Sequence, residues 1–129
     1  MISSDKIESF LVKMSLSFQQ VAAGTWVIQD AAKGIDNLLI ILSDPLVVLR
    51  LAVMEVPARG KEKLFEELLR LNASDMVHGA YALDGRHVII VDTLEADTMD
   101  LAEFEASIDA IGLAVAQHYR VLSSYRVKA

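Results

Sequence analysis

Cysteine is absent from the 129 residues of this chain, and both proline and glycine are scarce. Without thiols the chain can form neither a disulfide framework nor a thiolate metal site. The six glycines are scattered, so the sequence contains neither a phosphate-binding loop nor a dinucleotide fingerprint. No serine occupies a Gly-x-Ser-x-Gly nucleophile elbow. These absences predict a protein that is not an enzyme and has no catalytic residues or cofactor.

Excess positive charge and a long hydrophobic run are also missing. The formal net charge is -6, which argues against binding to nucleic acid or to an anionic membrane. The longest apolar stretches, Leu38–Leu42 and Leu46–Leu49, are far too short to span a bilayer. The first residues show no basic leader with a long apolar segment, so no signal peptide is visible. We therefore expect a cytoplasmic protein with neither a nucleic-acid nor a membrane partner.

The three histidines do not predict a metal site. A predicted hairpin places His78 and His87 on one face, but about 13 Å apart along the strand. One zinc ion cannot bind two ligands at that separation, because each ligand must lie near 2 Å from the metal. His118 has no ligand-type residue four positions away in either direction. We expect no metal ion in this protein.

Apolar side chains, in contrast, are abundant. Hydrophobic residues make up 53% of the sequence, somewhat above the usual proportion. A chain of this length forms a single domain, here residues 1–129, and buries about two-thirds of its unfolded surface. Part of the apolar excess is expected at an interface with another protein.

Hydrophobic periodicity predicts four elements in the first half of the chain. Ser4–Met14 forms a helix, because its apolar residues recur at helical spacing. Strands follow at Thr25–Gln29, Asn37–Leu42 and Val47–Val56. The third strand is apolar on both faces, and such a strand requires cover on both sides.

The second half predicts a helix, a hairpin and a long final helix. Lys61–Leu71 carries a broad leucine-rich stripe. Asp84-Gly85 suits a two-residue type I′ turn between strands Val77–Leu83 and Arg86–Thr93. The last helix begins near Thr98 or Asp100 and extends to about Leu122.

The resulting order is helix, three strands, helix, two strands, helix. It predicts an α+β fold in which helices pack against an antiparallel sheet. Gly112 lies inside the last helix, where glycine costs about 1 kcal/mol relative to alanine. We expect that this glycine permits the helix to approach a strand or another helix closely.

Two stretches carry a resemblance to a known family. Leu68–Ala73 ends a leucine-rich helix, and His78–Val91 forms a hairpin of apolar and aromatic residues. With the element order, they resemble the type III secretion chaperone-like superfamily, and particularly its YbjN-type, Tir-chaperone-like branch. The resemblance covers nearly the whole chain. It implies a homodimer without catalytic residues that holds another protein.

Two apolar surfaces are the candidate interfaces. We predict that the leucine-rich stripe of Lys61–Leu71 and the strand Val47–Val56 form a homodimer interface. The predicted interface residues are Met54, Phe65, Leu68 and Leu69. We predict that the first helix and the sheet beside it bind a client protein, through Ile7, Phe10, Leu11 and Met14. The alternative that the stripe of the first helix is consumed by the domain's own core remains open.

Two functions fit these observations. The first is a dimeric cytoplasmic chaperone or adaptor that holds a segment of a client protein. The second is a regulatory or scaffold α+β domain, roadblock-like or ligand-sensing, without chaperone activity. Element order discriminates between them in part, because a roadblock-like domain has two strands before its central helix rather than three.

Overall fold

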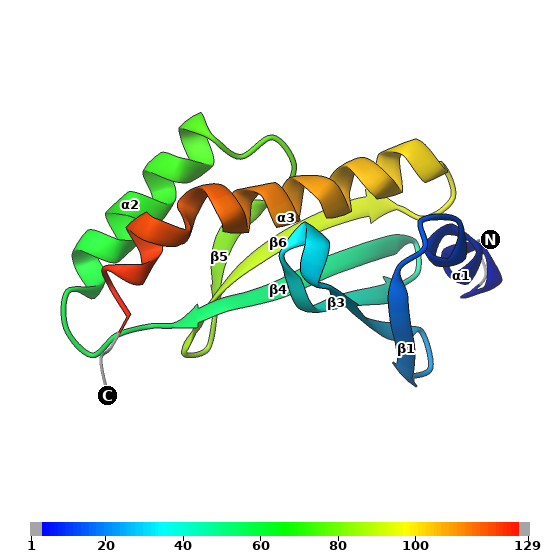
Figure 1. Ribbon diagram of the computed structural model, residues 1–129, viewed down its shortest axis with the longest axis horizontal. Helices are drawn as coiled ribbons and strands as arrows, with labels where there is room; N and C mark the ends of the chain where they lie inside the picture. Colours follow the sequence, from blue (N-terminus) through cyan, green and yellow to red (C-terminus); the bar gives the residue numbers. More distant parts are fainter. Residues whose placement is uncertain (1–3, 127–129) are drawn as a thin grey trace.

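The computed structural model describes residues 4–126, which form an α+β fold (Figure 1). The class predicted from the sequence is confirmed, with antiparallel strands and helices packed against them. The elements in chain order are α1 (Ser4–Lys13), β1 (Ser17–Ala22), β2 (Thr25–Asp30), the 3₁₀ helix η1 (Ala31–Lys33), β3 (Ile35–Ser43), β4 (Leu46–Glu55), α2 (Lys61–Ser74), β5 (Ala80–Asp84), β6 (His87–Glu95) and α3 (Leu101–Ser123).

The six strands form one sheet in the order β1-β2-β3-β4-β6-β5, so β1 and β5 are its edges. Strand β1 was not expected from the sequence, which predicted three strands before α2 where the structure has four. Its residues mix polar and apolar types without alternation, and all except the half-buried Phe18 are exposed. A strand that buries so little carries almost no hydrophobic pattern, and periodicity therefore cannot reveal it.

The β5–β6 hairpin turns at Gly85-Arg86, one residue later than predicted. Asp84 pairs with His87, so Asp84 belongs to the strand rather than to the turn. Gly85 has a φ of 58° and is the first turn residue, the position that a type II′ turn assigns to glycine. The predicted type I′ turn would have placed glycine second. Within this hairpin Tyr81 pairs with Ile90, and both side chains are buried.

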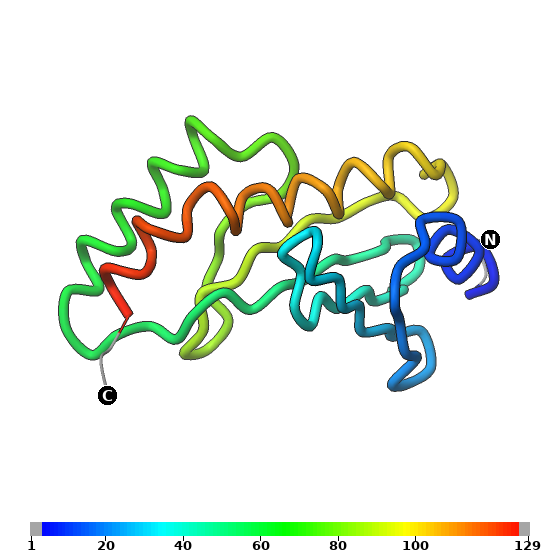
Figure 2. Tube along the Cα trace, viewed as in Figure 1, coloured from blue at the N-terminus to red at the C-terminus, as the bar shows by residue number. Residues whose placement is uncertain are grey.

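One face of the sheet and the inner sides of the helices enclose the hydrophobic core. Trp26, Leu49 and Ile90 point into it from three different strands, and each is fully buried. Figure 1 shows α3 lying along β6 and β4, with α1 near its first turn. The contact between α1 and α3 includes the rings of Phe10 and Phe104, whose centroids are 5.5 Å apart. Figure 2 shows α2 beside the C-terminal half of α3. The stripe of each helix thus serves the core.

The opposite face of the sheet is not covered by the helices of residues 4–126. Its central side chains are Val27, Leu39, Ile41 and Val48, which are adjacent across β2, β3 and β4 and are half-buried. The prediction that β4 is apolar on both faces is therefore correct, but helices of residues 4–126 cover only one of these faces. An apolar sheet face that the protomer leaves open is available to another molecule.

Gly112 lies where the backbone of η1 approaches α3 most closely. A Cβ atom at this position would lie 2.4 Å from the carbonyl oxygen of Lys33. The same crossing carries an ion pair between Lys33 Nζ and Asp109 Oδ1, at 2.6 Å. The expected close approach of a backbone to this glycine is confirmed. Among the described residues, no helix is long and apolar enough to cross a membrane.

Candidate protein-binding site

The edge strand β5 is blocked at its centre by the side chain of Asn72 from α2. Asn72 Nδ2 donates to the carbonyl oxygen of Tyr81 at 3.2 Å, and the Tyr81 amide donates to Asn72 Oδ1 at 2.7 Å. Because β5 pairs with β6 on its other side, these two groups of Tyr81 point outward. Of the residues in β5, only Tyr81 and Leu83 present their backbone groups to this side. Asn72 thus occupies half of the edge to which another strand could add.

A hydrogen-bond chain that runs from the buried Tyr81 and His118 to the exposed Asp75 holds Tyr81 in this position. Tyr81 Oη lies 2.7 Å from His118 Nδ1 on α3, and His118 Nε2 lies 3.0 Å from Asp75 Oδ2 at the end of α2. The chain continues to Ser74, whose hydroxyl donates to Asp75 Oδ1 at 2.7 Å. His118 is 3% exposed, so it reaches neither solvent nor a ligand. The chain therefore fixes β5, α2 and α3 to one another.

Two pKa values in this chain differ from their ordinary values. Burial, with a smaller contribution from the Asp75 carboxylate, raises the pKa of Tyr81 to about 12. The hydrogen bonds from Ser74 and then from His118 lower the pKa of the Asp75 carboxyl. A phenol that holds its proton so strongly is a poor nucleophile at neutral pH. The cluster is therefore suited to a structural role rather than a catalytic one.

The other edge strand, β1, is open along its length. Its only pairing partner within the described residues is β2, so its second edge has free backbone donors and acceptors. A hollow of about 280 Å³ lies beside it on the open face of the sheet, between side chains that include Gln19, Val21 and Val27. Val21 is 52% exposed. This edge offers both backbone hydrogen bonds and an adjacent depression for side chains.

The side chains predicted to bind a client lie mainly inside the protomer. Ile7 and Leu11 are fully buried and Phe10 is 8% exposed, because α1 packs this stripe against the core. Met14 is half-buried. Helix α1 is also fixed to β2, since Trp26 Nε1 donates to Glu8 Oε2 at 2.9 Å. The sequence left open the alternative that the domain's own core buries this stripe. The burial of Ile7, Phe10 and Leu11 agrees with that alternative.

The side chains predicted to form the dimer interface are divided between core and surface. Met54 and Leu68 are buried in the protomer, and Phe65 is half-buried. Leu69 is 69% exposed and lines a hollow of about 250 Å³ between α2 and β5, next to Leu83. Of the four predicted residues, Leu69 and Phe65 are the two whose side chains are accessible to a partner.

Taken together, the geometry defines an α+β protein with one blocked sheet edge, one open edge and exposed apolar surface on α2. A family model, CesT_Tir_1, matches residues 2–128. The chain belongs to this family, the CesT/Tir chaperone family, whose members are generally non-catalytic. None of the curated proteins matches this sequence.

Several solved structures share the fold at low sequence identity. YbjN from E. coli, described as a putative transcription regulator, is 16% identical with a TM-score of 0.72, and the match covers 93% of each chain. A chain of the heterodimeric ExoU–SpcU complex, from the type III secretion system of Pseudomonas aeruginosa, is 15% identical with a TM-score of 0.70. That match covers 86% of this chain and 93% of the other. A chain of the HopA1–SchA chaperone–effector complex is 8% identical with a TM-score of 0.66. That match covers 88% of this chain and 89% of the other.

Proposed function

We propose that this protein is a cytoplasmic chaperone or adaptor that holds an extended segment of a client protein against the open edge of β1. The observation that carries the proposal is the difference between the two sheet edges. The Asn72 side chain hydrogen-bonds to the backbone groups of Tyr81 in β5, whereas β1 pairs only with β2 within residues 4–126. A segment that adds a strand to the sheet therefore meets free backbone groups at β1.

Strand addition explains how such a site can act without catalytic residues. Backbone hydrogen bonds supply affinity, and alternate side chains of the added strand enter depressions on the two faces of the sheet. On the open face, the depression is the hollow beside Val21 and Val27. On the other face, Val12 of α1 is 64% exposed, and Met14, which directly follows the helix, is half-buried against the core. Of the four predicted client-binding residues, Met14 is the one that this proposal retains at the site.

We further propose that the chain forms a homodimer through the outer side of α2, centred on Leu69. An exposed leucine on a leucine-rich helix, with Phe65 and Leu83 beside it, is typical of the apolar centre of an interface. This surface lies at the opposite edge of the sheet from β1. A dimer formed there leaves both β1 edges accessible to clients.

The alternative is a regulatory or scaffold domain that responds to a ligand or to the state of a partner. The description of YbjN as a putative transcription regulator is in keeping with it. The number of strands before α2 argues against a roadblock-like arrangement, because four precede it here where a roadblock-like domain has two. The form of this alternative that remains is a ligand-sensing domain with the same fold.

The proposal is tested by isolating the tagged protein from its own cells and identifying the polypeptides that remain bound. A client is accepted when its purified form binds the purified chain again in a complex of defined stoichiometry. Gln20→Pro, at the centre of β1, should weaken this complex, because proline removes a backbone donor and disfavours an added strand. Lys63→Ala, at an exposed position of α2, serves as the control. Equal binding by both variants would exclude the β1 edge.

A further inference from the structure

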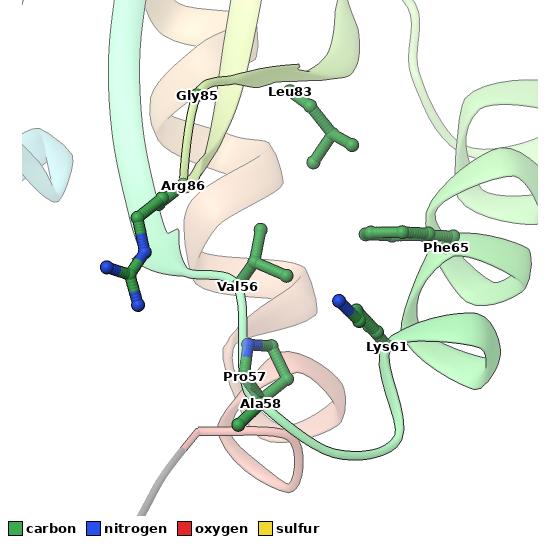
Figure 3. Close-up of a pocket in the computed structure, with 8 residues that line it drawn as sticks. All are labelled: Val56, Pro57, Ala58, Lys61, Phe65, Leu83, Gly85 and Arg86. Atoms are coloured by element: carbon green, nitrogen blue, oxygen red, sulfur yellow. The ribbon is translucent and has the colours of Figure 1, made fainter.

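A cavity of about 300 Å³ lies at the start of α2, near the edge of the sheet opposite to β1 (Figure 3). Three segments form its walls. Val56 and Pro57 follow strand β4, Phe65 comes from α2, and Leu83 comes from the β5–β6 hairpin. Leu83 is 50% exposed, and Val56 and Phe65 are half-buried. The protein thus leaves substantial apolar surface uncovered at this position.

One positive charge is directed at this apolar surface. Figure 3 shows the ammonium group of Lys61 turned toward the space between Val56 and Phe65, while the guanidinium of Arg86 points away. None of the lining residues is acidic. Within residues 4–126, Lys61 has no carboxylate within ion-pair distance. The cavity therefore combines apolar side chains with one inward-directed cation, Lys61, while the second cation of its lining, Arg86, points outward.

This combination selects one class of ligand. A neutral apolar molecule would leave the Lys61 ammonium unpaired beside a low-polarity group, and a cation would be repelled by it. A strongly hydrated inorganic anion would gain nothing from the walls. The chain carries a net charge of -6, so anions are not attracted to its surface in general. A carboxylate with an apolar tail satisfies both parts of the cavity.

We infer that this cavity binds a small carboxylate with an apolar tail, such as a medium-chain fatty acid. The tail lies against Phe65, Leu83 and Val56, and the carboxylate pairs with the Lys61 ammonium. The volume is at the lower end of the range for small-molecule sites, which excludes bulky ligands. The inference goes beyond the proposed client binding, because this cavity lies away from β1 and needs no client. The cavity shares Phe65 and Leu83 with the surface proposed for the homodimer, so the ligand and a second copy of the chain would compete for these two side chains.

Octanoate is the probe, and 1-octanol and octylammonium are its uncharged and oppositely charged counterparts. Each is titrated into the full ¹⁵N-labelled chain while amide chemical shifts are followed. Octanoate should produce saturable shifts at Ala58, Leu83 and Arg86, around the cavity. It should bind about fivefold more tightly than 1-octanol, which is the effect expected of one solvent-accessible ion pair. Octylammonium should bind more weakly than both.

Lys61→Met tests the role of the charge, since it keeps an unbranched side chain while removing the ammonium. It should reduce octanoate affinity about fivefold and leave 1-octanol affinity unchanged. Lys63→Met removes a charge from the same exposed turn but does not line the cavity, and it should change neither affinity. Dispersed amide spectra of both variants establish that they are folded.

Three results would overturn the inference. The first is the absence of saturable octanoate binding, and the second is a set of shifts that map elsewhere on the chain. The third is equal octanoate affinity in the wild type and Lys61→Met. None of these results bears on client binding at β1, so the ligand proposal and the client proposal fail independently.

Discussion

The side chain of Asn72 hydrogen-bonds to both backbone polar groups of Tyr81 and takes the place that a neighbouring strand would occupy. The two bonds measure 3.2 Å and 2.7 Å and join α2 to the edge of the sheet. Edge strands present unpaired backbone groups that recruit other chains unless the protein covers them. This protein interrupts one edge at its centre with an amide side chain and leaves the other available. The difference between the edges underlies the proposed function.

Replacement of Asn72 by alanine should lower the free energy of unfolding by about 1–3 kcal/mol, because it removes the partners of two backbone groups. Urea denaturation measures this change. The Tyr81 amide should also exchange faster with solvent. Arg70→Ala, at an exposed position of the same helix, should change the free energy by less than about 0.5 kcal/mol. An equal effect of the two substitutions would show that Asn72 does not secure β5.

Stability should depend on Tyr81 at alkaline pH. The raised pKa of about 12 means that the folded protein keeps a proton that the unfolded chain releases near pH 10. The contribution of Tyr81 is therefore complete below about pH 10 and is lost as the pH rises toward about 12. Between about pH 9 and 11, the wild type should lose more stability than Tyr81→Phe in urea unfolding. Parallel pH profiles of the two proteins would contradict the buried state of this phenol.

Gly112→Ala should destabilise the protein, although alanine is the better helix former. The added Cβ would clash with the Lys33 carbonyl oxygen, and relief of the clash must displace η1 from α3. Overpacking of this kind costs about 1–3 kcal/mol, which exceeds the gain of about 1 kcal/mol in helix propensity. Thermal unfolding measures the balance. A rise in the melting temperature would show that η1 moves aside at no cost.

Leu69→Glu should dissociate the proposed homodimer without unfolding the protomer. Leu69 is 69% exposed, so a charge there costs the isolated protomer little. In a desolvated interface the same charge is strongly unfavourable. Sedimentation should change from a dimer to a species of about 14.2 kDa, with an unchanged circular dichroism spectrum. The control Leu113→Glu, which replaces an exposed leucine on α3 instead of α2, should remain dimeric. A wild-type monomer at high micromolar concentration would refute the dimer.

The sequence predicts the buried part of this fold better than its edges. The sequence predicts β4 because one of its faces is continuously apolar, and β6 because it contains the apolar run Val88–Val91. It predicts α3 because the apolar stripe of this helix has a helical period. Strand β1 could not be found in this way, since it buries almost nothing. The Asp84-Gly85 pair fitted a common turn, yet Asp84 pairs with His87 within the hairpin.

The predicted interface residues show a related limit. Periodicity identifies the apolar side of a helix, but it does not say which surface covers that side. The stripe Ile7, Phe10 and Leu11 is covered by the protein's own core, while Leu69 of α2 remains outside. The blocking of β5 by Asn72 could not be foreseen, because it depends on a contact between a helix end and a strand nine residues later.

Amide hydrogen exchange of the chain with and without a purified client tests the central proposal most directly. If the client adds a strand to β1, the amides of Ser17–Ala22 should be protected in the complex, with additional protection in α1. The amides of β5 should exchange at the same rate in both states, because α2 already blocks that edge. Protection of β5 or of the outer side of α2, with β1 unchanged, would contradict the proposal.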